Sequence, residues 1–494
     1  MRNFFRIAAL LLLGGGWCLA PKPSFGSEAR VDSAGGLTTL MTDETTDLSF
    51  FMDGNPAGLV LLDHKDRADL SGQWFYSIAE PSAVGSVQQT LSTLPRLSEP
   101  NSFHYEGVMV FPEPGWAVQV GGDFLASQGQ PIFTNDTYTL SQYRGLLRTA
   151  YDLGPVALGL ELLTTQSDQH FDPGLFDPPA LGGPYFGLQS GSSGQDQTVI
   201  RGGFVTTFPE KPADDQGRWQ AGGYVGAQLG SSTETQDLSL FTLGSSAFPI
   251  SRTMNLVDHY TFDPEIRYEV PGRFILRFSY IMTYWDQDFS QTVPAGTPLL
   301  TSIASFRATQ FRSMNANGEF KVMEPLSDKE TLKIGGSLAS YTNDTDLLNP
   351  DQSLYDSQNK QWINATLGVG LESLYDYLYG IQFKTQNYLH DVPSTNNTDN
   401  NSPADFDSYQ LAVGGEKWLS SNWAFRLGLI VETDIYGQGS HLQTLNTTVT
   451  AGVGYESLFW KADLKMVAGQ TVDINDSSNT STQTGAQLAG TLFL

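Results

Sequence analysis

Cysteine is almost absent from this 494-residue sequence, since the only one is Cys18. It lies in an N-terminal stretch that carries Arg2 and Arg6, then an apolar core and then small residues. This order predicts a cleaved secretory signal over residues 1–26, and therefore an exported protein. Without the signal the chain has no cysteine, which excludes a disulfide framework, a thiol nucleophile and a cysteine-ligated metal.

Charged residues and long apolar runs are also scarce. Only 16% of the residues are Asp, Glu, Lys or Arg, against about 25% in soluble proteins. Beyond the signal, no apolar run reaches the ~18 residues of a membrane helix. The formal net charge is -26, and because a polyanion repels such a surface, nucleic acid is excluded as a partner.

Motifs for catalysis and cofactor binding are missing as well. The sequence has no GxSxG elbow and no phosphate-binding glycine loop, and no two of its six histidines have the spacing of a metal site. The acidic loops 342–352, 394–407 and 473–479 carry oxygen ligands that Ca²⁺ could use, but they lack the glycine of an EF-hand loop. We therefore predict solvated loops, no enzyme activity, no cofactor and no metal.

Strict alternation of polar and apolar residues fills most of the chain. The polar and apolar sides of stretch 460–468 are Lys461, Asp463 and Lys465 against Trp460, Leu464 and Met466. The same period of two recurs at 156–163, 273–285, 313–323 and 422–431. Such a period indicates β-strands with two different faces. A soluble sandwich would bury the apolar face in a core, whereas a membrane barrel would turn it to lipid and turn the polar face to a lumen.

The lengths of the connections favour the barrel. Links after every second predicted strand are short: 112–115, 152–154, 270–272, 419–422 and 455–457. The alternate links are long and polar: 80–101, 167–195, 231–257, 287–303, 344–359 and 390–404. Short turns at one end and long loops at the other are typical of outer-membrane barrels. We predict an all-β fold, a transmembrane antiparallel β-barrel over residues 69–494.

About 18 strands are expected, within a range of roughly 14 to 20, and an even number brings both ends of the barrel to the same side of the membrane. The predicted strands are 69–79, 102–112, 115–125, 138–152, 155–166, 196–208, 218–230, 258–269, 273–286, 304–322, 330–343, 360–371, 377–389, 405–418, 422–436, 441–455, 458–472 and 483–494. Aromatic residues such as Tyr151, Trp219 and Trp460 lie near their ends, as expected of girdles at the two membrane surfaces.

These features predict a location in a bacterial outer membrane, with outer-membrane lipid and lipopolysaccharide around the barrel. The chain ends in Phe493-Leu494. An aromatic residue at this place resembles the signal by which the barrel-assembly machinery recognises its clients. That machinery is therefore expected to be a partner during export.

Residues 27–68 do not alternate, and they contain the stretch DGNPAGL at 53–59. This stretch resembles the N-terminal hatch of the FadL/OmpP1 family of outer-membrane transporters for long-chain fatty acids and hydrocarbons. The family's Asn-Pro-Ala motif corresponds to Asn55, Pro56 and Ala57. The resemblance covers residues 34–63 and implies that 27–68 form a plug inside the barrel. It also implies a hydrophobic small molecule as ligand.

The NPAG sequence forms a turn for local reasons. Asn55 precedes a proline and is biased away from helix, Pro56 fixes φ, and Gly58 permits a positive φ. The turn either seats the plug as a fixed structural element or acts as a gate that reshapes when substrate binds. The neighbouring Phe50 and Phe51 either pack against the lumen wall or line an apolar pocket.

Paired glycines form a second candidate feature. Family members are thought to release ligand sideways through a kinked strand, and Gly121-Gly122 occupy a place where a kink is plausible. Similar pairs at 202–203, 222–223, 335–336 and 414–415 favour a different interpretation, namely close packing inside the barrel.

Three functions remain open at the level of sequence. The first is uptake of a hydrophobic small molecule, fatty acid or hydrocarbon, gated by the plug. The second is a diffusion porin for small polar solutes, which the number of strands and the mixed lumen charges favour. The third is a structural or secretion-associated barrel that docks partner proteins through its long loops.

Overall fold

The computed structural model describes the barrel strands and two short parts of the N-terminal segment. The described residues are 34–41, 55–61, 67–80, 101–111, 115–129, 138–176, 186–208, 217–241, 246–270, 272–292, 308–348, 354–373, 376–392, 406–436, 443–457, 460–474 and 480–493. The predicted signal, Phe50 and Phe51 lie outside these residues. Neither helix in the described residues has the length or apolar character needed to cross a membrane.

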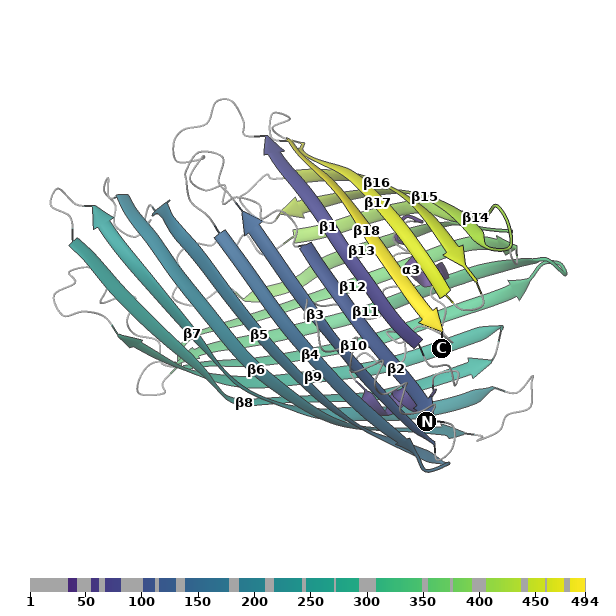
Figure 1. Ribbon diagram of the computed structural model, residues 1–494, viewed down its shortest axis with the longest axis horizontal. Coiled ribbons are helices and arrows are strands. Elements are labelled where there is room, and N and C mark those ends of the chain that lie inside the picture. Colours follow the sequence, from purple (N-terminus) through teal and green to yellow (C-terminus); the bar gives the residue numbers. More distant parts are fainter. Residues whose placement is uncertain are drawn as a thin grey trace.

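One antiparallel sheet of eighteen strands forms the described body of the chain (Figure 1). The strands are β1 (Arg67–Glu80), β2 (Asn101–Phe111), β3 (Trp116–Gly129), β4 (Tyr138–Asp152), β5 (Val156–Phe176), β6 (Phe186–Phe208), β7 (Arg218–Phe241), β8 (Ser246–Val270), β9 (Phe274–Thr292), β10 (Ala308–Pro325), β11 (Glu330–Leu348), β12 (Leu354–Ser373), β13 (Tyr377–Val392), β14 (Phe406–Trp418), β15 (Trp423–Tyr436), β16 (Gln443–Glu456), β17 (Trp460–Asp473) and β18 (Thr480–Phe493).

The sheet closes on itself. Each strand pairs with its neighbours in sequence, and β1 pairs with β18 along its whole length, from Arg67 opposite Phe493 to Glu80 opposite Thr480. The pairing of β1 with β2 is shorter and runs only from Arg67 to Gln73. Every described strand thus has a neighbour on both sides, and residues 74–80 of β1 have no described partner on the β2 side. Closure of the sheet is the condition for a β-structure in hydrocarbon. The predicted number of strands and the predicted barrel are therefore confirmed.

The lengths predicted for the loops are wrong on one side of the barrel. Most of 167–195 is strand, because β5 runs to Phe176 and β6 begins at Phe186. Most of 231–257 is strand too, because β7 ends at Phe241 and β8 begins at Ser246. These strands have more than 20 residues, whereas a tilted strand needs ~9–11 to cross the bilayer. Hydropathy does not alternate strictly in the excess, so the sequence pattern did not indicate strand there.

Alternation of the two faces is confirmed where the prediction was most specific. On β17, Trp460, Leu464 and Met466 are 44%, 41% and 52% exposed on the outer surface. The side chains between them face inward, and Asp463 and Lys465 are only 7% and 8% exposed. Apolar side chains thus cover the outer surface, which fits a barrel whose outer solvent is lipid.

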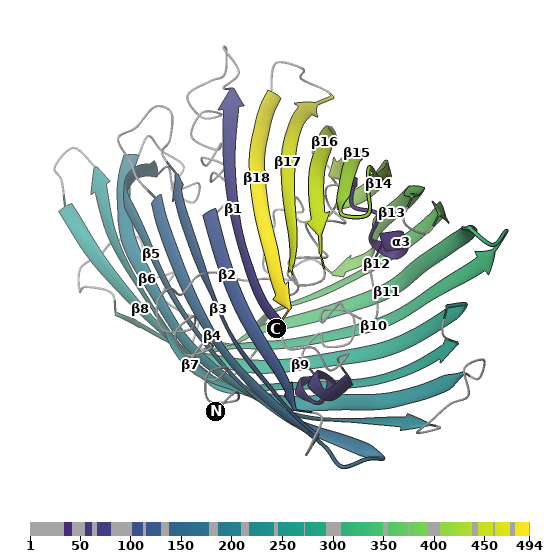
Figure 2. The same ribbon diagram turned by 45° about the vertical axis from the view of Figure 1, so that its right-hand side comes forward.

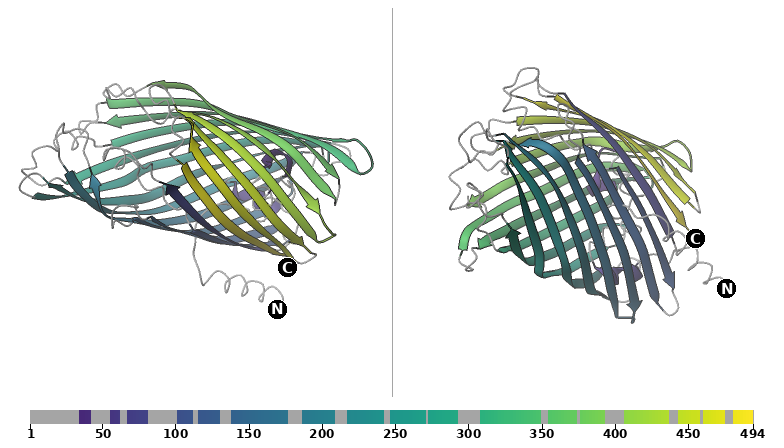
Figure 3. Two further views of the ribbon diagram at one scale, coloured as in Figure 1. Left: turned by 90° about the horizontal axis from the view of Figure 1, so that it is seen from above. Right: turned by 60° about the vertical axis from the view of Figure 1, so that its left-hand side comes forward.

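Two short helices lie inside the barrel against opposite arcs of its wall (Figures 2 and 3). They are α3 (Thr38–Met41), beside β11 and β12, and η1 (Pro56–Leu61), beside β3 to β6. Both contact the wall near the end where the strands are joined by short turns. We call this end the short-turn end.

Candidate functional site

The inner wall and the two N-terminal pieces form the candidate site. We call residues 34–41 the first anchor and residues 55–61 the second anchor. The first anchor lies on the arc from β11 to β15, and the second lies on the arc from β2 to β7. The two anchors therefore contact opposite arcs of the barrel wall near its short-turn end, although they are close together in the sequence.

Asn55 holds the second anchor to the wall. Its side-chain Nδ2 donates a hydrogen bond to the carbonyl oxygen of Phe204 on β6, at 3.1 Å. Its Oδ1 accepts from the backbone N–H of Ala57, also at 3.1 Å, which caps the start of η1. The Asn55 carbonyl accepts from Gly58 N at 3.2 Å and completes the turn. Asn55 is only 6% exposed. Its one side-chain amide thus supplies hydrogen-bond partners to a carbonyl of the wall and to an N–H of the turn at a buried position.

Glycines on the wall make room for this turn. A Cβ placed on Gly159 of β5 would lie 2.6 Å from Cα of Ala57, and one on Gly203 of β6 would lie 3.0 Å from Cδ of Pro56. A Cβ on Gly222 of β7 would lie 3.3 Å from Nδ2 of Asn55. The paired glycines 202–203 and 222–223 therefore serve close packing inside the barrel through Gly203 and Gly222, as the second interpretation of these pairs expected.

Leu59 completes the second anchor with apolar contact. It is fully buried in a cluster with Val108, Ala117 and Ala150 from β2, β3 and β4, and Val60 packs against this cluster. Leu59 thus packs against the wall and does not line an open pocket.

The first anchor begins with a turn at Gly35 and Gly36, whose φ angles of 89° and 68° favour glycine. Gln382 on β13 fixes this turn by donating from Nε2 to the Gly36 carbonyl at 3.0 Å. The same amide accepts from Oγ1 of Thr38 at 3.3 Å. Gln382 is 3% exposed. Like Asn55 in the second anchor, it is a buried amide that forms a hydrogen bond to backbone between anchor and wall.

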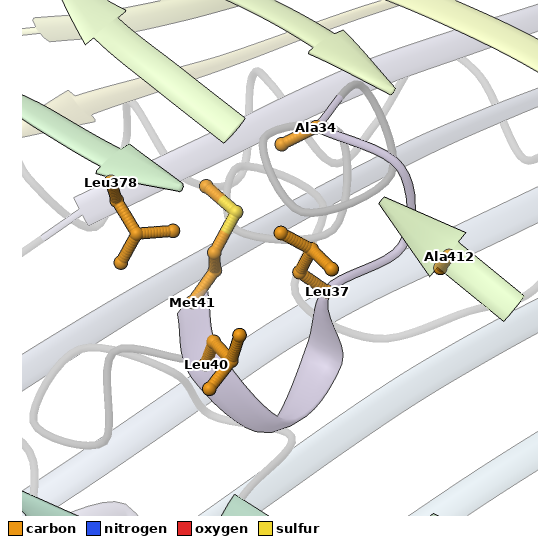
Figure 4. Close-up of a cluster of buried hydrophobic side chains, with 6 residues drawn as sticks. All are labelled: Ala34, Leu37, Leu40, Met41, Leu378 and Ala412. Carbon is orange, nitrogen blue, oxygen red and sulfur yellow. The ribbon is translucent and has the colours of Figure 1, made fainter. Parts of the chain in front are cut away.

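Apolar burial supplies the rest of the first anchor. Leu37 and Leu40 are fully buried and Met41 is 4% exposed. Figure 4 shows these side chains grouped with Leu378 of β13 and Ala412 of β14. Small residues of the wall again allow the approach, since a Cβ on Gly414 would lie 2.8 Å from the carbonyl carbon of Ala34.

Ion pairs surround the anchors on the inner wall near the short-turn end. Glu161 on β5 bonds Arg148 of β4 and also Arg201 of β6, the latter at 2.8 Å. Arg426 on β15 bonds Glu416 of β14 at 2.7 Å and also Asp463 of β17. We call the whole set the ionic belt; its members are Arg148, Glu161, Arg201, Arg218, Glu265, Arg267, Glu269, Arg277, Glu319, Lys333, Glu372, Glu416, Arg426 and Asp463.

Charges of opposite sign in the belt satisfy one another across neighbouring strands. Glu161 and Glu416 have side chains that are 0% and 1% exposed, so their charges depend on the arginines beside them. The belt therefore consists of separate groups of two or three paired charges, in which seven basic side chains balance seven acidic ones, and it does not form a field of one sign.

Beyond the belt, the inner wall is mostly polar and uncharged. Inward-facing amides and hydroxyls there include Gln142, Thr165, Ser167, Gln197, Gln228, Thr261, Ser279, Asn315, Asn317, Ser337, Asn343, Asn364, Thr366, Gln386, Ser408, Gln410, Asn446, Thr448 and Thr450. Charged side chains that also face inward among these described residues include Arg144, Asp263, Lys360, Lys384, Glu432 and Asp434. Glu432 and Asp434 are hydrogen-bonded to neighbouring side chains. A wall of this kind can exchange hydrogen bonds with a neutral polar solute along its height.

The structure places the predicted site residues unequally. It brings Asn55, Pro56, Ala57 and Gly58 together against the wall, whereas Phe50 and Phe51 lie outside the described residues. Gly121 and Gly122 pair in continuous register with β2 and β4. Sideways release at that place stays a prediction. The wall contacts of the first anchor, the role of Gln382 and the pairing within the belt were not predicted, because the contacting residues are on different strands or far apart in sequence.

Searches of protein-family models and of curated proteins find no match to this chain. Among solved structures, it is similar to the CymD monoaromatic hydrocarbon channel, with a TM-score of 0.39, 13% identity, and 93% of this chain and 97% of that chain covered. It is also similar to the toluene transporter TbuX of Ralstonia pickettii, with a TM-score of 0.35, 13% identity, and 95% of this chain and 98% of that chain covered. For the siderophore receptor PiuA of Acinetobacter baumannii the TM-score is 0.39 and the identity 10%, with 86% of this chain and 82% of that chain covered. At these TM-scores the likeness does not extend to a substrate.

Proposed function

We propose that this chain is an outer-membrane channel for small polar solutes, and that its N-terminal segment narrows the short-turn end as a plug. The observation that carries the proposal is the contrast between the two faces of the strands. The outer face is apolar, whereas the inner face beyond the belt consists mainly of Asn, Gln, Ser and Thr. A path lined by neutral donors and acceptors replaces the hydration of a polar solute and offers little to an alkyl chain.

The plug is proposed from the two anchors. They lie on opposite arcs at one level, and each combines an amide that bonds backbone with a buried leucine. The apolar side chains Leu37, Leu40 and Leu59 are buried against the wall. Movement of either anchor would widen the end of the channel without disturbing the sheet, because the contacts that would break are few and local.

A second candidate is uptake of a hydrophobic small molecule. The packing of Asn55, Pro56 and Ala57 against the inner wall favours it, because this is the place that a hatch in the FadL/OmpP1 family would occupy. The inner wall beyond the belt is the reason that we rank it second.

Removing the plug tests the first proposal. Deletion of residues 34–63 should raise ion conductance in planar bilayers, whereas deletion of residues 27–33 alone serves as the control and should leave it near the level of the mature chain. Unchanged conductance after the longer deletion would remove the plug from the proposal.

Solute choice separates the two candidates. Proteoliposomes that carry the mature chain should swell in glucose and in mannitol faster than protein-free liposomes. Saturable binding of palmitate without any swelling would contradict the polar channel and favour the hydrophobic ligand.

A further inference from the structure

Charges of opposite sign lie on either side of one uncharged residue of the inner wall. Lys384 on β13 and Glu432 on β15 are both in register with Gln410 of β14, which separates them. Thr366 on β12 and Asn446 on β16 continue the row at its two ends. We call these five residues the charge-split row. Because Lys384 and Glu432 lie on second-neighbour strands, their Cα atoms are roughly 10 Å apart.

The ammonium group of Lys384 is open to the lumen. Lys384 lies two positions after Gln382, whose side chain bonds the first anchor, and alternate residues of a strand share a face. Lys384 is exposed, and within the described part of the chain no side chain forms an ion pair or a hydrogen bond with it. The belt charges next along β14 and β15, Glu416 and Arg426, instead pair with each other at 2.7 Å. Lys384 is thus a cation that a solute in the lumen can reach.

Carboxylates form the other side of the row. Glu432 is half-buried and accepts a hydrogen bond from Oγ of Ser408 at 3.0 Å. Asp434, two positions further along β15, accepts from Oγ1 of Thr444 at 3.3 Å and from Nδ2 of Asn446 at 3.2 Å. These donors are neutral, so they orient the two carboxylates and leave their negative charge in place.

Other charges on this arc strengthen the division. Asp473 on β17 is in register with Thr444 and adds a third carboxylate to the acidic side. Lys360 lies on the basic side, on β12, but it is six positions from Thr366 and further from the short-turn end. Residues 34–41 of the first anchor contain no charged residue. The row therefore presents one cation and, two strands away, an excess of anions.

The charge-split row lies directly beside the first anchor. Gln382, two positions before Lys384, bonds that anchor through its side-chain amide. Ile430, two positions before Glu432, packs against the apolar cluster of the same anchor. A solute held by the row would therefore lie next to the plug.

From this arrangement we infer that the charge-split row binds a small zwitterion of the α-amino-acid class, with its carboxylate on Lys384 and its ammonium group on Glu432. In such a solute a single carbon joins the two charged groups, and the amide of Gln410 can donate and accept hydrogen bonds between them. A simple anion would be attracted by Lys384 but repelled by Glu432 and Asp434, and a simple cation would meet the reverse. The inference rests on the proposed polar channel and gives that channel a substrate class.

Calorimetric titration of the mature chain in a nonionic detergent tests the inference directly. L-alanine should bind saturably. Propionate and ethylamine each lack one of its two charged groups, and each should bind at least about 10-fold more weakly, because one charged contact is lost. This comparison uses the unmodified chain and does not depend on the folding of a variant.

Two variants should separate the two halves of the site. Lys384→Met keeps the length of the side chain but removes the cation, so it should weaken L-alanine binding about 3- to 10-fold and leave ethylamine binding no weaker. Glu432→Gln should weaken L-alanine binding by a similar factor and leave propionate binding no weaker. The matched control is Lys417→Met, which removes a lysine that pairs with Asp376 at the short-turn end; it should bind L-alanine like the unmodified chain.

The outcomes separate this inference from the channel proposal. No saturable L-alanine binding by the unmodified chain, or equal affinity for L-alanine and for propionate or ethylamine, overturns the zwitterion site. Unchanged L-alanine affinity in a Lys384→Met protein that keeps heat-modifiable gel mobility also overturns it. Swelling of proteoliposomes in glucose without L-alanine binding would remove the site alone and leave the channel in place. Saturable L-alanine binding without swelling in any solute would leave the site in place and contradict the channel.

Discussion

The two anchors reach the same end by different means, although they belong to one short segment. The first is held mainly by apolar burial, with Leu37, Leu40 and Met41 packed against the inner wall. The second is held mainly by one amide, because Asn55 bonds both the wall and its own turn. An apolar contact tolerates exchange of one aliphatic side chain for another, whereas the bonds of a buried amide depend on the placement of individual atoms. The second anchor is therefore the more specific of the two.

The largest effect is expected from filling the space beneath the second anchor. Gly159→Leu places a side chain where Ala57 lies and should displace η1, so the conductance in planar bilayers should approach that of the 34–63 deletion. Gly202→Leu is the control, since a Cβ there faces outward and lies 3.8 Å from Cδ2 of Leu160. A closed Gly159→Leu channel would show that the second anchor does not narrow the path.

A smaller effect than that of Gly159→Leu is expected from a substitution in the first anchor. Leu40→Ala removes a fully buried side chain from the apolar cluster and should weaken docking of residues 34–41 by about 2–5 kcal/mol. Amide hydrogen exchange of Leu40 and Met41 should accelerate by several orders of magnitude while exchange in η1 stays unchanged. Acceleration at both anchors would show that they move as one unit.

Asn55→Ala should loosen the second anchor by about 1–3 kcal/mol, because the Phe204 carbonyl and the Ala57 N–H both lose their partner. Hydrogen exchange of residues 55–61 reports the change. Asn55→Asp refines the test, because it retains the acceptor for Ala57 but turns a carboxylate oxygen to the Phe204 carbonyl. We expect it to be at least as disruptive as alanine. Unchanged exchange in the Asn55→Asp protein would remove the specificity claimed for the amide.

The smallest effect is expected at Gln382. Gln382→Leu keeps the volume but removes the bonds to Gly36 and Thr38, and it should cost about 0.5–1.5 kcal/mol. Exchange at Thr38 should rise modestly, with conductance near that of the unmodified chain. An effect larger than that of Leu40→Ala would mean that the first anchor also depends on an amide.

The same difference explains what could be read from the sequence. The second anchor is a local motif, so Asn55 to Gly58 could be recognised from their neighbours in the chain. Leu37 and Leu40 resemble any apolar residues, and their place depends on Leu378 and Ala412, which are more than 300 positions away in the sequence. The role of Gln382 was equally hidden, since its partners Gly36 and Thr38 are more than 340 positions away in the sequence.

The barrel was predictable because the hydropathy of alternate residues reflects the solvent that each face of a strand meets. Lys465 and Met466 alternate only because one face meets lipid and the other does not. At the far ends of β7 and β8 the hydropathy does not alternate strictly, and these strand residues were predicted as loop. The wall glycines were visible as pairs, but only closure of the barrel shows that Gly203 lies beneath Pro56.

The seam between β1 and β18 sets the order in which this protein can be made. It pairs Arg67 with Phe493, which are 426 positions apart in the sequence, and so it can form only after the last strand has been synthesised. Until then the first strand presents an unpaired edge, which readily joins other chains. A chain truncated anywhere before β18 would keep that edge open permanently and would be exposed to proteolysis.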